Sequence, residues 1–380
     1  MKPRVIVGLA ILLAVLLGGG LLVMWFQGGG GRPVGPSTAA PAVVKCAGGS
    51  EKSALMRDPE VVAILAADYG ISLDFRSMGS YAQVLLSADE IRAQGFNCLW
   101  PSSGSARLVF ESGHRGEFAE YRAQTVLQSP EVVYSGPQAT DALTRAGLVT
   151  DDGGSRILDI KGLLAGHVLT GDTWEKLQAG RLAGPVRIAT TDAATSNSGF
   201  TMAQLQLTVI ATEDVSVPPT LEQARAVLPT MRHLYETAGL QASSSDGGFR
   251  QWLTQGGEYA APLYAGYENQ IIQLATTSPD PARVLANVSI LYPSPTIYSD
   301  HPILALDAAS SRLIDAMSDP RIQALAWQKY GFRSAFDPSL NDTSRFGDLP
   351  LAAQVRTIPA PSGEVTLALL HCFEDATQCS

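Results

Sequence analysis

Hydroxyl and amide side chains gather in the segment 190–200, where a predicted strand over 184–189 runs into a predicted helix. Asn197 and Ser198 are suitable N-caps for that helix, and Gly199 would let a ligand approach the backbone closely. A helix N-terminus offers free N–H groups and the positive end of the helix dipole, so this junction suits an anion. Helix capping alone would also explain the serine and the asparagine.

Two further junctions of the same kind come earlier in the chain. A predicted strand over 42–47 is followed by a Gly-Gly turn and Ser50, and a predicted strand over 71–78 is followed by a glycine and Ser80. Either serine could simply cap a helix. All three junctions lie at the carboxyl ends of strands, which is where open α/β sheets bind ligands. Together they form a candidate ligand site.

The order of the predicted elements is that of an α/β protein. Predicted helices over 58–69 and 81–94 lie between the predicted strands, which indicates a parallel sheet with right-handed crossovers. Further helices are predicted over 174–182 and 221–238, with a kink or break expected at Pro229. Because 380 residues exceed what one hydrophobic core usually supports, we expect two lobes.

The composition narrows the classes of function. With 46% hydrophobic and 17% charged residues the chain is globular, and its net charge of -9 argues against a nucleic-acid partner. An anionic ligand would therefore have to be held by local donors. The five histidines show no metal-ligand spacing and no C-x-x-C pair occurs, so we expect no metal and no cofactor. No G-x-S-x-G motif occurs either, and we expect a protein that is not an enzyme.

Four cysteines allow three pairings into two disulfides. Cys372 and Cys379 are close in sequence and could close a short loop, in which case Cys46 would pair with Cys98, both at strand ends. Free buried cysteines are the alternative. Disulfides would persist in an oxidising compartment outside the cytoplasm.

The N-terminus predicts membrane attachment. Lys2 and Arg4 precede an uncharged run over 5–26, and a helix of these 22 residues would rise about 33 Å, enough to cross a bilayer. We therefore expect residues 1–26 to be a cytoplasmic stub and transmembrane signal anchor in the cell membrane, with the rest extracytoplasmic. A cleaved signal peptide is the alternative. The Gly- and Pro-rich residues 27–42 are expected to be a linker.

Several short motifs follow one another in a recognisable order: Gly48-Gly49-Ser50, Met78-Gly79-Ser80, Trp100-Pro101-Ser102-Ser103, Ser196-Asn197-Ser198-Gly199 and Tyr292-Pro293-Ser294-Pro295-Thr296. In this order they resemble bacterial extracellular solute-binding proteins with the type 2 periplasmic-binding-protein fold. The run 322–333 is similar to membrane-tethered members known as substrate-binding domain proteins. The resemblance covers 43–334.

The resemblance implies two Rossmann-like α/β lobes joined by crossing hinge strands and closing on a ligand. Lobe I would hold 43–124 plus 292–380, and lobe II would hold 125–291. The resemblance also implies a set of ligand-binding residues contributed by both lobes: Ser50, Ser80, Thr195, Ser196, Asn197, Ser198, Tyr267 and Glu268.

The predicted ligand is a small solute. Hydroxyls and helix N-termini without a counter-charge favour an oxyanion. Asp192 or Glu268, if either pointed into the cleft, would instead favour a cationic or hydroxyl-rich solute. The predicted function is solute capture for ABC transport, with a permease as partner. The alternative is a sensor or adaptor that signals to a regulatory membrane protein.

Overall fold

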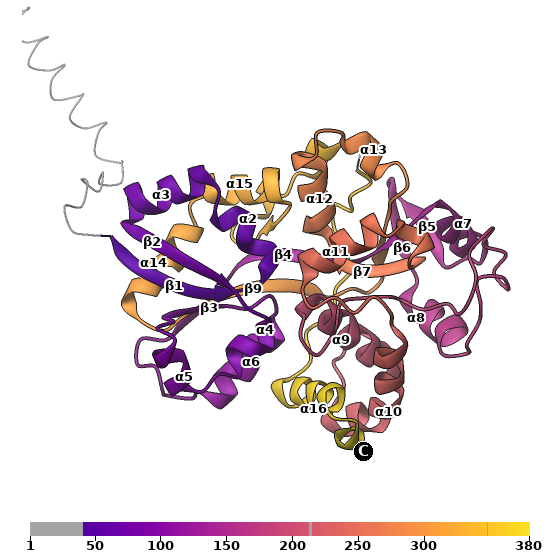
Figure 1. Cartoon of the computed structure of the whole chain (residues 1–380), viewed down its shortest axis with the longest axis horizontal. Coiled ribbons are helices and arrows are strands. Elements are labelled where there is room, and N and C mark those ends of the chain that lie inside the picture. The colour runs from indigo at the N-terminus through magenta and orange to yellow at the C-terminus, as the bar shows by residue number, and fades with distance from the viewer. Residues whose placement is uncertain (1–40, 213–214, 348) are drawn as a thin grey trace, which may run out of the picture. The chain divides into compact units, whose positions relative to one another are not determined.

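Three parallel strands form one side of the sheet, with β2 at its edge: β1 (Ala42–Gly48), β2 (Ile71–Ser77) and β3 (Cys98–Trp100), in the order β2-β1-β3. These strands and their parallel direction were predicted from the sequence. β9 (Tyr298–Ala305) pairs with β3 in the antiparallel direction, so the sheet is mixed. Figure 1 shows β9 running beside β3.

A second group of strands is built on the other half of β4 (Arg122–Ser135). The first half of β4, as far as Pro130, pairs with β9, and the second half pairs with β7 (Leu263–Tyr267) and β8 (Ser289–Pro293). β4 and the connection from β8 to β9 therefore cross between the two groups of strands (Figure 1). The boundaries between lobe I and lobe II, at 124/125 and at 291/292, stay a prediction.

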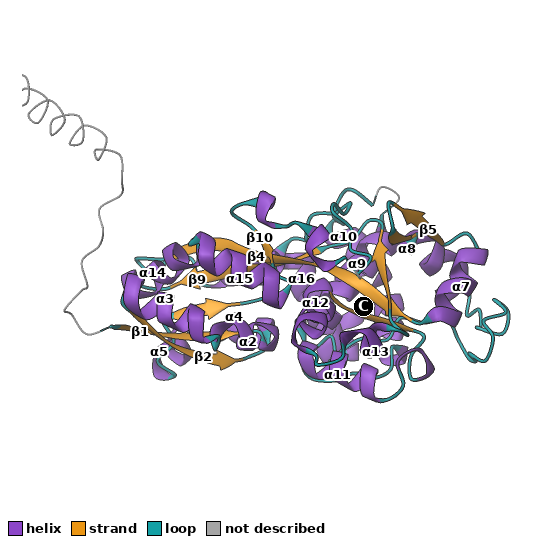
Figure 2. Cartoon of the chain, turned by 90° about the horizontal axis from the view of Figure 1, so that it is seen from above, coloured by secondary structure: helices purple, strands orange, loops and turns teal. Residues whose placement is uncertain are grey.

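The remaining strands are short and lie at the margins. β6 (Ser155–Leu158) pairs with β8, β5 (Val149–Asp152) pairs with β6, and β10 (Arg333–Ser334) pairs with β4. Helices surround both groups of strands (Figure 2). They are α2 (Ser53–Met56), α3 (Pro59–Tyr69), α4 (Ser80–Val84), α5 (Ala88–Ala93), α6 (Gly104–Gly113), α7 (Pro137–Arg145), α8 (Ile160–Leu163), α9 (Asn197–Ala211), α10 (Leu221–Thr237), α11 (Ser245–Thr254), α12 (Glu268–Thr277), α13 (Pro281–Leu285), α14 (Ala308–Met317), α15 (Pro320–Tyr330) and α16 (Gly363–Glu374).

Two predicted helices differ from the observed ones. The helix predicted over 81–94 is split into α4 and α5, because Ser87 caps a new helix and forms a capping box with Glu90. α10 continues through Pro229 without the predicted break.

The segment 174–189 was predicted as a helix followed by a strand, and this is wrong in detail. The helix is replaced by turns, since Gln178 and Gly180 adopt left-handed backbone conformations with φ of 54° and 67°. The strand is reduced to isolated bridges, in which Ala189 exchanges backbone hydrogen bonds with the edge of β7.

The C-terminal helix α16 packs against both α6 and α10. In the chain, α6 comes before β4 and α10 comes after β4. The packing is apolar and includes aromatic contacts. The ring of Phe200 on α9 lies 4.5 Å from that of Tyr81 on α4 and 6.1 Å from that of Phe373 on α16, measured between centroids. One hydrophobic cluster therefore joins β1, β3 and β9 of the first group of strands to α9, α10 and α16.

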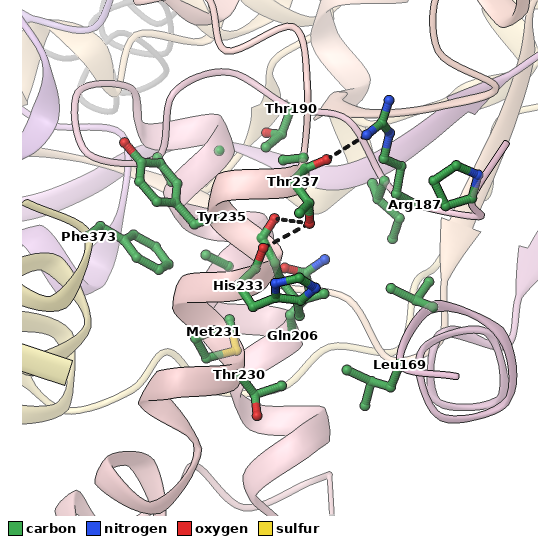
Figure 3. Close-up of a pocket in the computed structure, with 18 of the residues that line it drawn as sticks. Leu169, Arg187, Thr190, Gln206, Thr230, Met231, His233, Tyr235, Thr237 and Phe373 are labelled. Atoms are coloured by element: carbon green, nitrogen blue, oxygen red, sulfur yellow. Dashed lines mark hydrogen bonds between the residues drawn. The ribbon is translucent and has the colours of Figure 1, made fainter. Parts of the chain in front are cut away.

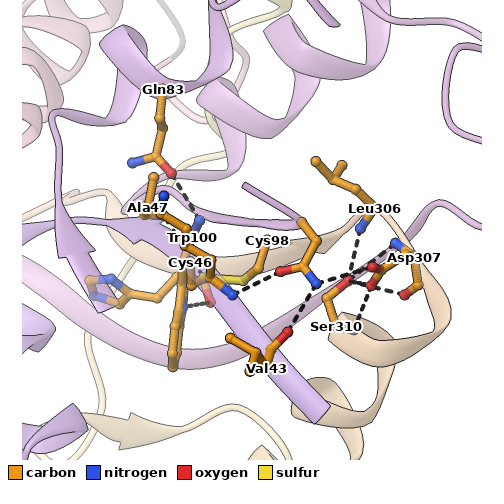
Figure 4. The surroundings of a disulfide bond; sticks show 12 residues. Val43, Cys46, Ala47, Gln83, Cys98, Trp100, Leu306, Asp307 and Ser310 are labelled. Atoms are coloured by element: carbon orange, nitrogen blue, oxygen red, sulfur yellow. Dashed lines mark hydrogen bonds between the residues drawn. A yellow bond between two sulfur atoms is a disulfide. The ribbon is translucent and has the colours of Figure 1, made fainter. Parts of the chain in front are cut away.

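Both predicted disulfides are present. Cys46 and Cys98 lie opposite each other in the β1–β3 register and are bonded (Figure 4). Cys372 on α16 is bonded to Cys379 in the turn that follows. The first disulfide fastens two central strands together, and the second closes a short C-terminal loop.

Removing the C-terminal disulfide with Cys372→Ala and Cys379→Ala is expected to lower the free energy of unfolding by about 2–3 kcal/mol, because the closed loop is short. Urea denaturation would measure this loss. The control is a concentration of reducing agent that leaves the Cys46–Cys98 disulfide oxidised. At this concentration the double variant should lose no further stability. A midpoint equal to that of the wild type would refute the prediction.

The structure is a computed structural model and describes residues 41–212, 215–347 and 349–380. Contacts group Pro41–Ser380 into one compact unit, which holds all the described hydrophobic clusters and both disulfides, so we expect this fragment to fold by itself. The predicted signal anchor over 1–26 lies outside the described residues, as does the linker as far as Ala40. Within the described ranges no helix is long and apolar enough to cross a membrane.

Candidate functional site

A small pocket of about 170 Å³ lies where the loops after β1, β2 and β3 meet the N-termini of α9 and α11. Its walls are rich in hydroxyl groups, and we call it the serine pocket. It is lined by Gly49, Ser50, Glu51, Ser77, Met78, Gly79, Ser80, Ser102, Thr195, Ser196, Asn197, Ser243, Ser244 and Ser245.

The two sides of the serine pocket are in direct contact. A Cβ atom on Gly79 would lie only 2.6 Å from the backbone oxygen of Thr195, so glycine is required for this approach. Next to this contact the side-chain amide of Asn197 donates a hydrogen bond to the backbone oxygen of Ser102 (3.1 Å). The loops therefore enclose a space that suits a ligand of only a few heavy atoms.

The hydroxyls of three predicted site residues do not act as helix caps. In the described structure Gly49 and Gly79, not Ser50 and Ser80, occupy the N-cap positions of their helices. The N-cap of α9 was predicted to be Asn197 or Ser198, but it is Ser196. The side chain of Ser196 makes no capping hydrogen bond. The hydroxyl of Ser80 instead accepts a hydrogen bond from the backbone N–H of Ser102 (2.9 Å). Capping alone therefore does not explain these serines.

Two helix N-termini border the serine pocket. α9 has 15 residues and begins at Asn197, and α11 has 10 residues and begins at Ser245. The positive ends of both helix dipoles thus lie at the wall of the pocket. Ser244 caps α11 by accepting a hydrogen bond from Gly247. Both N-termini favour negative charge in the ligand.

A buried ion pair forms part of one wall, since Glu51 lines the pocket and Lys52 lies behind it. The Lys52 ammonium, with no exposed surface, donates to Glu51 Oε1 (2.6 Å), Ser102 Oγ (2.8 Å) and His301 Nδ1 (3.1 Å). Burial would by itself raise the pKa of the Glu51 carboxyl, but the charge of Lys52 and the hydrogen bonds from Lys52 and Ser102 lower it to about 2. Burial and Lys52 hold the pKa of His301 well below 6.5, so its imidazole is neutral. Glu51 and Lys52 therefore cancel each other's charge at the pocket.

The structure brings together five of the eight predicted ligand-binding residues: Ser50, Ser80, Thr195, Ser196 and Asn197 all line the serine pocket. Ser198 and Tyr267 lie behind this wall. The Ser198 hydroxyl is hydrogen-bonded to those of Thr191 and Ser245 (both 2.9 Å), and the Tyr267 hydroxyl accepts a hydrogen bond from Asn197 (2.8 Å). These two residues support the pocket wall and do not line it.

Glu268 and Asp192, whose carboxylates would have opposed an anion, do not line the serine pocket. Glu268 is fully buried, pairs with Arg333 (2.7 Å) and accepts a hydrogen bond from the Tyr292 hydroxyl (2.6 Å). Asp192 accepts hydrogen bonds from the N–H of Ala194 in its own loop and from the hydroxyl of Tyr235. Glu268 was predicted to bind the ligand in the cleft. The structure corrects this position, because Arg333 and Tyr292 hold the Glu268 carboxylate in the core.

Glu51 and the run Ser243–Ser245 line the serine pocket but were not predicted from the sequence. The run directly precedes a helix, as the predicted serines do, and this pattern could have indicated it. Glu51 carried no comparable signal. Within the described ranges no group of three or more His, Cys, Asp or Glu side chains is arranged to hold a metal ion.

Comparison with known proteins gives matches among solved structures only. No family model and no curated protein sequence matches the chain. The ferric binding protein from Campylobacter jejuni matches with a TM-score of 0.54 and 12% identity, covering 88% of this chain and 98% of that one. The sulfate-binding protein SubI from Mycobacterium tuberculosis H37Rv matches with a TM-score of 0.51 and 14% identity, covering 83% and 94%.

A two-component system protein that mediates signal transduction matches with a TM-score of 0.51 and 13% identity, covering 86% of this chain and 100% of that one. Since identities this low establish a shared fold and nothing more, ligand and partner cannot be transferred from these structures. The first two proteins are named for binding and not for catalysis. The chain has the type 2 periplasmic-binding-protein fold of bacterial solute-binding proteins.

Proposed function

We propose that this chain is a membrane-tethered, extracytoplasmic solute-binding protein, and not an enzyme, that captures a small oxyanion in the serine pocket for transport. The observation that supports this most directly is the lining of the pocket, in which eight serines lie beside the N-termini of α9 and α11. Such neutral donors bind an oxyanion without a counter-charge. The volume of about 170 Å³ suits a small solute.

The proposed location follows from the N-terminal sequence and the disulfides. The uncharged run over 5–26 would anchor the chain, and Cys46–Cys98 and Cys372–Cys379 suit an oxidising compartment. Under this proposal a membrane permease receives the ligand.

A sensor or adaptor is the second candidate function. α16 packs on both α6 and α10 and would resist the large hinge opening that ligand delivery needs. The match to a two-component system protein shows that the fold also occurs in signalling. Under this alternative a regulatory membrane protein replaces the permease.

Thermal unfolding of fragment 41–380 with sulfate, phosphate or molybdate tests the oxyanion proposal. An anion at 100 times its dissociation constant should stabilise the fragment by about 2.7 kcal/mol. Ser50→Ala combined with Ser243→Ala removes two lining hydroxyls that make no hydrogen bond within the described residues. Since a hydrogen bond to a charged group contributes about 1.5–3 kcal/mol, the double variant should bind at least about 100-fold more weakly.

The matched control is Ser112→Ala combined with Ser318→Ala, two serines that do not line the pocket, and it should retain the anion effect. Stabilisation only by amino acids or sugars would overturn the oxyanion proposal and point to Glu51 as the recognition group. No response to any solute would favour the sensor or adaptor.

A further inference from the structure

A second and larger cavity, of about 580 Å³, lies between α9, α10 and the segment 185–190 (Figure 3). Its volume falls in the range of about 300–1,000 Å³ that is usual for sites of drug-sized ligands. The loop before α9 contributes to both cavities: Thr190 and Ala193 line the larger one, whereas Thr195 and Ser196 line the serine pocket. The two cavities are nevertheless separate and differ in chemistry.

The wall of the larger cavity is mostly apolar. Its apolar side chains come from the π-helical turn Leu164–Val168 and the residue after it, from the segment 185–190, and from α9, α10 and α16. They include Val168, Leu169, Ile188, Ala203, Met231 and Phe373. Such a wall would bind the apolar body of a ligand by burying its surface.

The polar side chains that line this cavity include one arginine cation and several groups that can donate hydrogen bonds. Arg187 lines both this cavity and a neighbouring one of about 340 Å³. Its exposed guanidinium donates one hydrogen bond, to the backbone oxygen of Thr237 (3.1 Å), and has no carboxylate partner within the described ranges. His233 projects from α10 among the lining residues in Figure 3. None of the described lining residues is Asp or Glu, although the chain as a whole carries a net charge of -9.

An unsatisfied hydroxyl lies at the same wall. Thr190 is only 7% exposed, and its Oγ1 has no hydrogen-bond partner in the described part of the chain. Buried polar groups are usually paired, so an unpaired hydroxyl at a cavity wall points to a missing polar partner.

We propose that this cavity binds an organic anion whose apolar body fills the space between α9 and α10 and whose carboxylate or sulfonate group contacts Arg187 and His233. Arg187 binds such a group with parallel N–H donors, and the absence of acidic lining residues leaves the anion unopposed. This site does not depend on the oxyanion proposal, because the serine pocket lies elsewhere and shares no lining residue with it.

Two fluorescent probes of similar shape test the proposal on fragment 41–380: the anion 8-anilino-1-naphthalenesulfonate and the uncharged N-phenyl-1-naphthylamine. We expect both to bind saturably, at one molecule per chain. Arg187→Gln should weaken binding of the sulfonate about tenfold and leave the uncharged probe within about twofold, since only the sulfonate uses the charge. Arg225→Gln, at an exposed position on α10 outside the cavity, is the matched control and should change neither.

Two further variants separate this site from general surface binding. Thr230→Trp places a large side chain in the cavity and should abolish binding of both probes. Leu169→Glu adds an acidic group at a position that is 43% exposed, so the fold should tolerate it, and it should weaken only the sulfonate. Sulfonate binding that is unaffected by Arg187→Gln and Leu169→Glu, or that is not saturable at one molecule per chain, would overturn the proposal.

Discussion

Replacing Lys52 with methionine is expected to lower the free energy of unfolding by about 3–5 kcal/mol, the usual cost of removing one partner from a buried ion pair. Lys52 has no exposed surface, and its ammonium is the donor that joins Glu51, Ser102 and His301. Methionine would fill similar volume but leave the Glu51 carboxylate buried without its counter-charge. Chemical denaturation at neutral pH would measure the loss.

Two comparisons isolate the ion pair from the loss of packing. Glu51→Gln combined with Lys52→Met removes both charges and should recover much of the stability, because no uncompensated charge remains. Lys176→Met, which breaks an ion pair whose lysine is 67% exposed, should cost less than about 1 kcal/mol. If Lys52→Met costs no more than Lys176→Met, the buried pair contributes little and the prediction fails.

The Lys52 pair also shows which parts of the site could be predicted from sequence. Ser50 and Ser80 were predictable because each follows a glycine at the end of a predicted strand, and that local pattern determines where their backbones lie. Glu51 and Lys52 are adjacent charged residues, a pattern typical of a solvated surface. They are buried only because Ser102 and His301, distant in sequence, pack over them.

The same physical reason explains the misplaced Glu268. It directly follows a strand, which is where ligand-binding side chains occur, but its partner Arg333 lies 65 residues away and satisfies the carboxylate inside the core. The packing of α16 against both α6 and α10 was not predicted either. Local patterns predicted most strands and several helices, whereas pairing between distant charges and helices depends on tertiary packing.

A second large effect on the free energy of unfolding is expected from Glu131. This residue lies on β4 at the point where the pairing partner of β4 changes from β9 to β7. Its side chain is fully buried, and neither carboxylate oxygen has a hydrogen-bond partner within the described residues. Tyr267 is its cross-strand neighbour. Burial raises the pKa of the Glu131 carboxyl well above 4.5, so the folded protein favours the protonated form.

This shift determines the sign of the pH dependence. Below pH 4.5 the carboxyl is protonated in both the folded and the unfolded chain and contributes no pH dependence. Above that value only the unfolded chain releases the proton, so stability falls by up to about 1.4 kcal/mol per pH unit until the folded pKa is passed. Glu51 acts in the opposite direction, since its pKa of about 2 contributes stability that is lost as the pH falls through that value.

Glu131→Gln is therefore expected to stabilise the protein relative to the wild type by an amount that grows with pH. Glutamine has nearly the same shape, and it releases no proton when the chain unfolds. The difference in free energy of unfolding between variant and wild type, measured by denaturation from pH 5 to pH 9, isolates Glu131 from Glu51 and all other groups. Glu364→Gln, at an exposed position on α16, should stay within about 0.5 kcal/mol of the wild type throughout. A Glu131→Gln difference that does not change with pH would mean that the buried carboxyl titrates alike in the folded and unfolded chains, contrary to its lack of partners.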